Sequence, residues 1–248
     1  MNTSNPKVAL ITGSSRGIGA AIAKRLAQDG MRVVINYAGR AADAEKVVQE
    51  ITKAGGRALA IQADVSNPEE AARLFEQATA EFGGVDILVN NAGVMQPGLV
   101  PVAETSDELF DRLIAINLKG TFNTLRLAAK QLRAGGRIVN FSTSVVGLAL
   151  PGYAVYASTK AAVETLTNIF AKEMRGRQIT VNSVAPGPTA TDLFLNGKTP
   201  EQIEHLAKMP PLERLGRPED IANVVSLLVG ADGGWINGQT LRANGGIV

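Results

Sequence analysis

Short runs of β-branched and aliphatic residues alternate along this chain with longer segments whose apolar residues recur at helical spacing. The candidate strands are Val8–Thr12, Arg32–Tyr37, Arg57–Gln62, Ile87–Asn90, Arg137–Ser142, Thr180–Ala185 and a short run near Thr240–Arg242. This alternation is typical of βαβ units, in which a helix crosses over between two parallel strands. The pattern therefore predicts an α/β fold with a doubly wound parallel sheet and helices on both faces.

The segments between these strands carry the helical signal. Ile18, Ile22 and Leu26, for example, lie four residues apart on one helix face. The candidate helices are Ile18–Asp29, Asp43–Ala54, Pro68–Phe82, Ser106–Ala134, Ala154–Arg175 and a last one that begins at Pro218. No repeat or linker-like tract divides the sequence, so we expect one domain over residues 1–248.

Residues 187–216 break the alternation. This segment has no clear strand and contains Pro188, Pro200, Pro210 and Pro211. A long irregular segment in a compact domain is often a functional lid. We interpret it as a substrate lid, with a poorly ordered surface excursion as the alternative.

Composition excludes several kinds of site and partner. The chain has no cysteine and a single histidine, His205, so it cannot form disulfides, thiolate sites or multi-histidine metal clusters. We expect no metal. Lys and Arg total 25 against 23 Asp and Glu, with no basic block, which argues against nucleic acid or a membrane as partner. The polar Met1–Lys7 lacks the apolar stretch of a secretion signal, so we expect a cytoplasmic protein.

A glycine-rich turn follows the first candidate strand. Residues 12–19 read TGSSRGIG and lead directly into a helix. Glycines let the backbone approach a ligand closely, and the amides at the helix start favour an anion. No Gly-Lys-Ser/Thr follows, so this is not a nucleoside triphosphate loop. The turn predicts a dinucleotide pyrophosphate site of the Rossmann type, although glycine can also serve turn geometry alone.

The end of the second strand bears on which dinucleotide binds. Residues 36–40 read NYAGR and contain no acid that would accept hydrogen bonds from the ribose 2′-hydroxyl of NAD. Arg16 and Arg40 could instead bracket a 2′-phosphate. We therefore favour NADP(H) over NAD(H); the alternative is that these are two surface arginines.

Tyr156 has a lysine four residues later, Lys160, which places both side chains on one helix face. A nearby ammonium favours the phenolate, so it would lower the tyrosine pKa and make the hydroxyl a usable general acid or base. Taken alone, such a pair is more often a solvated tyrosine beside a lysine. Its context decides the interpretation.

The motifs together resemble those of the short-chain dehydrogenase/reductase family, from about Lys7 to the last residue. They are Thr12-Gly13-x-x-x-Gly17-x-Gly19, Asp64-Val65, Asn90-Asn91-Ala92-Gly93, Asn117, Ser142-Thr143-Ser144, Tyr156-x-x-x-Lys160 and Pro186-Gly187. The resemblance implies an NAD(P)-dependent alcohol dehydrogenase or ketoreductase that forms a homo-oligomer, a tetramer or a dimer, packed partly through the two long helices.

The same resemblance implies roles for individual residues. Tyr156 would be the general acid or base, Lys160 would hold the nicotinamide ribose, and Asn117 would hold a water that relays protons. The implied cofactor-binding residues are Gly13, Ser15, Arg16, Gly17, Ile18, Gly19, Tyr37, Arg40, Asp64, Val65, Asn91, Ala92, Gly93, Tyr156, Lys160, Pro186, Gly187, Thr189 and Thr191.

The serine that would bind the substrate oxygen is ambiguous. Ser144 begins the Ser-x-x-Gly pattern of the family but lies one residue nearer Tyr156 than the common spacing, which Thr143 matches. A one-residue deletion in the loop Leu148–Val155 would reconcile the two. We favour Ser144 as the catalytic residue and expect Ser144→Ala to be the more damaging change.

The implied substrate pocket is apolar and includes Met95, Val146, Tyr153 and Phe194. An apolar pocket favours a hydrophobic carbonyl compound over a sugar or an acid. The sequence therefore predicts NADP(H)-dependent reduction of a ketone to a secondary alcohol. The alternatives are a 3-oxoacyl thioester reductase, acting on an acyl carrier protein, and a dinucleotide-sensing protein without catalysis.

Overall fold

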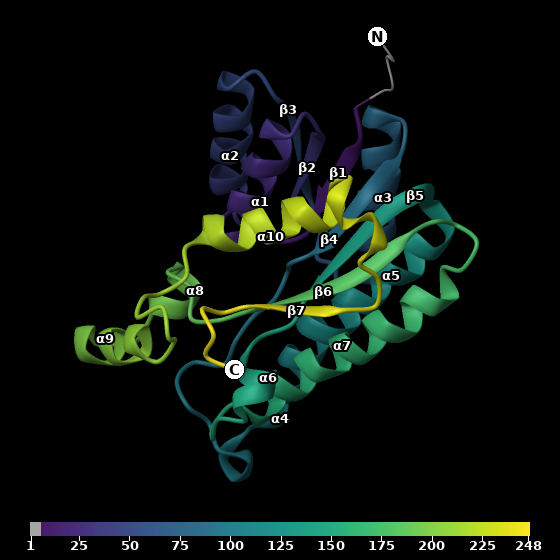
Figure 1. The fold of residues 1–248 in the computed structure, drawn as a ribbon. Coiled ribbons are helices and arrows are strands. Elements are labelled where there is room, and N and C mark those ends of the chain that lie inside the picture. Colours follow the sequence, from purple (N-terminus) through teal and green to yellow (C-terminus); the bar gives the residue numbers. More distant parts are fainter. Residues whose placement is uncertain (1–5) are drawn as a thin grey trace.

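A computed structural model describes residues 6–248; Met1–Asn5, which make up most of the polar N-terminal segment, lie outside the described residues. Seven strands form one sheet in the order β3-β2-β1-β4-β5-β6-β7, and every neighbouring pair is parallel (Figure 1). Their bounds are β1 Val8–Ile11, β2 Arg32–Tyr37, β3 Arg57–Gln62, β4 Val85–Asn90, β5 Leu132–Phe141, β6 Thr180–Pro186 and β7 Thr240–Ala243. The predicted doubly wound parallel sheet is confirmed.

Helices cover both faces of the sheet. One face packs against α1 (Gly17–Gln28), α2 (Ala41–Lys53) and α10 (Pro218–Val229). The other packs against α3 (Pro68–Phe82), α5 (Gly120–Gln131) and α7 (Ala154–Glu173). The sheet is thus buried on both sides, which explains why its strands read as nearly continuous apolar runs.

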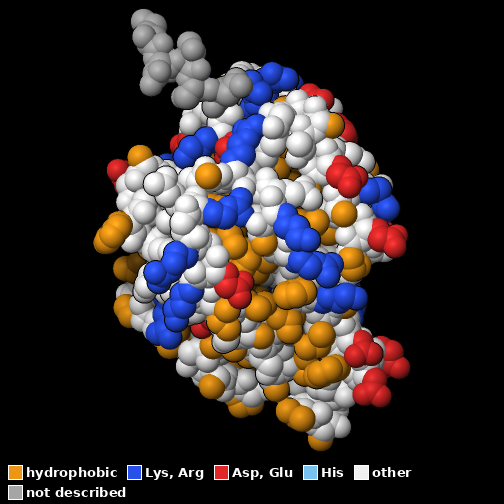
Figure 2. Space-filling model, turned by 90° about the vertical axis from the view of Figure 1, so that its right-hand side faces the viewer, with side chains coloured by type: hydrophobic (Ala, Val, Ile, Leu, Met, Phe, Trp, Pro, Cys, Tyr) orange, Lys and Arg blue, Asp and Glu red, His pale blue; other side chains and the backbone are white. Residues whose placement is uncertain are grey.

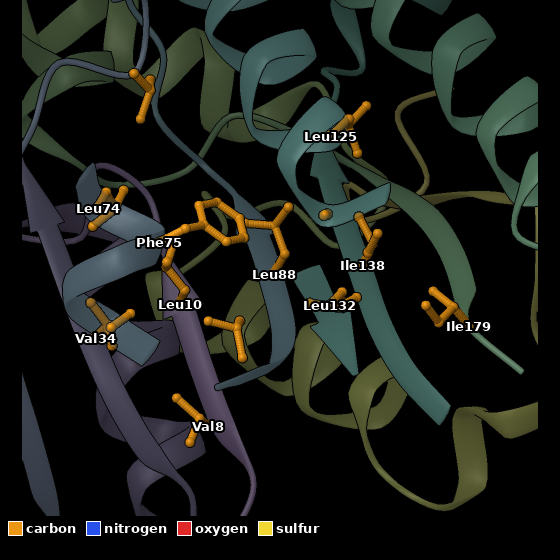
Figure 3. Packing of buried hydrophobic residues seen from close by; sticks show 14 of the residues in the cluster. Val8, Leu10, Val34, Leu74, Phe75, Leu88, Leu125, Leu132, Ile138 and Ile179 are labelled. Atoms are coloured by element: carbon orange, nitrogen blue, oxygen red, sulfur yellow. The ribbon is translucent and has the colours of Figure 1, made fainter. Parts of the chain in front are cut away.

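On the α3 side of the sheet, apolar side chains of the helix pack on apolar side chains of the central strands. Phe75 of α3 lies fully buried above Leu10 of β1 and Leu88 of β4 (Figure 3). Burial of an aromatic side chain of this size contributes about 2–3 kcal/mol by transfer from water. This packing fixes the central strands, whose carboxyl ends carry the glycine turn and the Asn90-Asn91 motif.

The predicted helix Ser106–Ala134 is not continuous. It divides into α4 (Asp107–Leu113), a π-helical turn over Ile114–Lys119 and α5, which ends at Gln131. Helix α5 ends early because the buried Leu132 joins the sheet opposite Val85. Sequence spacing cannot show a single inserted π turn, since it shifts the apolar pattern by only one residue.

Residues 187–216 contain two short helices, α8 (Asp192–Leu195) and α9 (Pro200–Lys208). Thr199 and Gln202 cap α9 reciprocally. A bridge between Thr189 and Gly216 closes the base of the segment. The segment thus contains more regular structure than the sequence indicated. Its two helices were missed because helices of this length span too few turns to show a periodic pattern.

Over residues 6–248, no helix is both long enough and apolar enough to cross a membrane, and no three acidic or histidine side chains come together as a metal site.

Candidate active site

A long cleft follows the carboxyl ends of the strands, the edge at which open α/β sheets bind ligands. One half lies over β1 and β2 and the other over β5, β6 and α7. The residues that line both halves, and so join them, are Ile18, Asn91, Gly93, Val94, Thr191 and Leu193. The cleft is therefore continuous from the glycine turn to Tyr156.

The glycine turn is closely packed against the loop after β4. Gly13 has a φ of +62°, and a Cβ there would lie 2.8 Å from the Ala92 Cα. A Cβ on Gly19 would lie 2.7 Å from the Gly13 carbonyl oxygen. The Asn91 side-chain amide donates to the carbonyl oxygens of Thr12 and Gly13, at 3.0 and 2.9 Å. These glycines are needed for backbone geometry and for close approach.

The start of α1 is suited to an anion. No side chain caps its N-terminus, and its first turn has no acid. Helix α3 differs, because Asn67 caps it and Glu69 and Glu70 lie in its first turn. The uncapped start of α1, whose Gly17, Ile18 and Gly19 line the outer half of the cleft, fits a dinucleotide pyrophosphate.

The outer half of the cleft contains the two arginines predicted to select the cofactor. Arg16, Tyr37 and Arg40 line it, and no acid stands at the end of β2. Arg40 Nη1 lies 3.3 Å from an Asp43 carboxylate oxygen, and Arg16 Nη1 lies 3.8 Å from Asp192 of the lid. Both guanidinium groups are partly exposed, so a phosphate can reach them.

Tyr156 and Lys160 lie together on α7 and face the inner half of the cleft. The Lys160 ammonium lies 6.0 Å from the centre of the Tyr156 ring and donates to the Phe141 carbonyl oxygen at 2.9 Å. Burial lowers the Lys160 pKa to about 8. The loss of water around Tyr156 raises its pKa to about 12. The expected lowering by Lys160 is therefore not found: desolvation, which penalises the phenolate, is the largest cause of the Tyr156 shift, and Lys160 is not among its causes.

The hydroxyl beside the Tyr156 phenol belongs to Thr143. Its side chain partly offsets the rise in the Tyr156 pKa, and both residues line the inner half of the cleft. The Ser144 hydroxyl instead donates to the Ala185 carbonyl oxygen at 3.2 Å and accepts from Asn244 Nδ2 at 2.9 Å. The two hydroxyls thus have different partners, although both side chains line the inner half of the cleft. Which of them binds the substrate oxygen stays a prediction.

Asn117 is fully buried in the π-helical turn. Its side chain accepts from the Val94 amide at 2.8 Å and donates to the Val94 carbonyl at 2.9 Å and to the Thr159 hydroxyl at 3.3 Å. It therefore braces the loop after β4 against α7. A Cβ on Gly93 would approach both Asn117 and Lys160, at 3.3 and 3.4 Å. The role of Asn117 in holding a water stays a prediction.

Comparison with known proteins agrees with this site. Residues 13–248 match the family described as enoyl-(acyl carrier protein) reductase. A short-chain type dehydrogenase/reductase of Picea abies is 46% identical, with 98% of this chain and 92% of that protein covered. The chain belongs to the short-chain dehydrogenase/reductase family. It is therefore an oxidoreductase.

Two further members of the short-chain dehydrogenase/reductase family are informative about the cofactor. The NADPH-dependent aldehyde reductase-like protein, chloroplastic, of Arabidopsis thaliana is 46% identical over 98% of this chain and 94% of its own length. A short-chain dehydrogenase of Burkholderia cenocepacia, solved in complex with NADP, is 38% identical with a TM-score of 0.91, covering 97% of each chain. These relatives favour NADP(H).

Nearly all the predicted site residues of this family member line the cleft. The outer half includes Gly13, Ser15, Arg16, Gly17, Ile18, Gly19, Tyr37, Arg40, Asp64, Val65, Asn91, Ala92 and Gly93. The inner half includes Met95, Tyr153, Tyr156, Lys160, Pro186, Gly187, Thr189, Thr191 and Phe194. Val146 does not line it, which corrects that prediction. The short helix α6 (Val145–Leu148) turns its side chain to a shallow groove beside Pro101 and Val102.

Sequence reasoning missed two residues that shape the site. Asn36 accepts from the Gly13 amide at 3.2 Å and donates to the Ala63 carbonyl at 3.0 Å, so it braces the glycine turn against the end of β3. A polar residue within an apolar strand was the available signal. Ile247 lines the inner half of the cleft, and its place near the end of the sequence gave no signal.

Proposed function

We propose that the protein reduces a ketone to a secondary alcohol with NADPH, reversibly. The observation that carries the proposal is the junction of the two cleft halves. There Tyr156 and Thr143 line an apolar cavity of about 180 Å³ that is continuous with the groove beside the glycine turn. A carbonyl oxygen placed against both hydroxyls would have its carbon near the same junction.

The reaction needs a hydride and a proton. When bound, NADPH supplies the hydride to the carbonyl carbon. Tyr156 donates its phenolic proton to the carbonyl oxygen, which completes the alcohol, and the raised Tyr156 pKa keeps that proton in place at neutral pH. Thr143 donates a hydrogen bond to the same oxygen as charge develops on it. Lys160 would hold the ribose hydroxyls, and its proton can replace the one lost by Tyr156.

The substrate chemistry follows from the cavity lining. Among the described residues that line this cavity, Lys160 is the only one with a charged side chain. Leu148, Leu150, Phe194 and Met209 supply apolar surface. An uncharged aliphatic or aryl ketone suits such a cavity, whereas a carboxylate or a phosphate would have to compete with the nicotinamide ribose for Lys160. We further propose that residues 187–216 act as the substrate lid, since Phe194 and Met209 belong to them.

Steady-state kinetics with NADPH against a panel of ketones and aldehydes tests this function. We expect the highest kcat/KM with uncharged apolar ketones and low activity with keto acids. Preferred use of 3-oxoacyl thioesters would support the acyl-chain alternative. NADPH binding without oxidation across the whole panel would contradict the proposal and favour a dinucleotide sensor.

The choice of cofactor gives a separate prediction. Arg16→Ala and Arg40→Ala should each raise the KM for NADPH by about tenfold to a hundredfold, the loss of about 1.5–3 kcal/mol expected for a hydrogen bond to a charged group. The KM for NADH should barely change, because NADH lacks the 2′-phosphate. Arg73→Ala, which removes an exposed arginine outside the cleft, is the matched control. A wild-type preference for NADH would overturn the assignment.

We also propose a homo-oligomer. Phe110, Phe122 and Ile169 on α4, α5 and α7 are each about half exposed. Figure 2 shows hydrophobic side chains gathered on the lower part of one face, with Lys and Arg above and to the left and Asp and Glu at the lower right. Exposed apolar side chains on neighbouring helices suit a second copy of this chain. Sedimentation equilibrium should give a dimer or a tetramer, and a monomer at micromolar concentration would contradict the proposed oligomer.

The cytoplasmic location of the protein stays a prediction.

A further inference from the structure

Residues 244–248 follow β7 and bend back toward the end of β5. Asn244 organises this segment. Its Nδ2 donates to the Ser144 hydroxyl at 2.9 Å and to the Val248 backbone oxygen at 3.1 Å, and its Oδ1 accepts from the Gly246 amide at 3.0 Å. One side chain therefore connects the strand end that carries Thr143 with the turn that carries Ile247.

The Ser144 hydroxyl completes the connection. It donates its single proton to the Ala185 carbonyl oxygen, and the Ser144 amide donates to the Pro186 carbonyl oxygen at 2.9 Å. Ser144 is 2% exposed, so little water can replace these partners. It thus ties β5 to β6 immediately beside Thr143.

The segment is also enclosed on its other side. Gly245 and Gly246 have φ values of +68° and +89°, and a Cβ on Gly245 would lie 3.0 Å from the Pro210 side chain. A Cβ on Gly187 would lie 2.8 Å from the Asn244 Cα. The turn therefore lies between the end of the lid and the end of β6, and Ile247 is held against the apolar cavity.

We propose that Asn244 is a positioning residue for the substrate side of the site and that Ile247 is a specificity-determining residue. Asn244 fixes Ser144 and thereby the direction of the neighbouring Thr143 hydroxyl. It also fixes the turn that places Ile247 in the cavity wall. The inference rests on the proposed function, and it assigns the size selectivity of the cavity to a segment outside the lid.

Kinetics of two neighbouring variants test the role of Ile247. Ile247→Ala should shift the ratio of kcat/KM between a bulky and a small ketone by about tenfold in favour of the bulky one, the scale of apolar pocket contacts. The KM for NADPH should not change. Val248→Ala is the matched control, because the Val248 side chain contacts Gly147 and does not line the cavity. If Ile247→Ala and Val248→Ala give the same ratio of kcat/KM between the bulky and the small ketone, the role of Ile247 in specificity is overturned.

Asn244→Asp tests positioning, because it preserves shape and removes both donated hydrogen bonds. We expect kcat to fall by about tenfold or more, as for an unsatisfied buried partner, with the KM for NADPH unchanged. Amide hydrogen exchange should accelerate over residues 142–148 in Asn244→Asp but not in Arg73→Ala, which changes an exposed side chain outside the cleft. If Asn244→Asp leaves the exchange rates of residues 142–148 unchanged, the positioning role is overturned, whether or not the protein reduces ketones. If the exchange rates change as expected but the wild-type protein reduces no ketone, only the proposed function is contradicted.

Discussion

Tyr156→Phe is expected to abolish turnover while leaving the protein folded and able to bind NADPH. The substitution removes one hydroxyl from a side chain in the cleft wall and keeps its ring, which packs 6.5 Å from the Tyr153 ring. Without that hydroxyl, the developing alkoxide loses the proton donor that the proposed mechanism assigns to Tyr156. General acid catalysis contributes about 10²- to 10⁴-fold, so kcat should fall by at least that factor.

Stopped-flow or steady-state NADPH oxidation measures the loss, and fluorescence titration measures cofactor affinity. Tyr153→Phe is the matched control, since it removes a hydroxyl from the neighbouring ring in the same cavity. Tyr153→Phe should keep most activity. A Tyr156→Phe protein with activity within a few fold of wild type would show that another group donates the proton, and the proposed mechanism would fail.

Thr143→Ala is expected to lower kcat for ketone reduction by about 10²-fold, the scale seen when one donor to a developing oxyanion is removed. The reason is geometric: the Thr143 hydroxyl lies beside the Tyr156 phenol, whereas the Ser144 hydroxyl is held by Ala185 and Asn244. Thr143→Ser should keep most of the activity, because it retains the hydroxyl.

Ser144→Ala separates the two residues. It should lower the free energy of unfolding by about 1–3 kcal/mol, because the Ala185 carbonyl oxygen loses the hydrogen bond from the Ser144 hydroxyl. Its effect on kcat should be smaller than that of Thr143→Ala. The opposite order, with Ser144→Ala the more damaging to kcat in a protein of unchanged stability, would return the substrate-binding role to Ser144.

The elements that the sequence predicts best are those whose periodic pattern extends over several turns and whose ends carry capping or turn residues. Helix α3 is predicted to the residue, because Asn67 and Pro68 mark its start and Phe82 is followed by a left-handed Gly83. Strands β2 and β3 also match their predicted bounds. The lid helices and the π-helical turn at Asn117 escaped prediction, since neither spans enough turns to establish a period.

The candidate site also has a part that the sequence predicted and a part that it did not. Parallel strands bring their carboxyl ends to one edge, so the order of motifs along the chain was enough to gather the glycine turn, Asn91, Tyr156 and Lys160 in one cleft. Side-chain direction at the strand ends was not predictable. Thr143 and Ser144 follow the end of β5 and Val146 lies on α6, so neither the partners of the two hydroxyls nor the groove that Val146 lines could be predicted from strand alternation.

The sequence by itself determined the α/β class and the parallel sheet, because these depend on local spacing that repeats along the chain, and its motifs were enough to identify, through their resemblance to a known family, the residues that line the cofactor groove. Only the tertiary structure decided which groups the Ser144 hydroxyl contacts, that desolvation raises the Tyr156 pKa, and that Ile247 lines the cavity. These properties depend on contacts between segments as far apart as Ser144 and Asn244, and local spacing carries no information about such contacts.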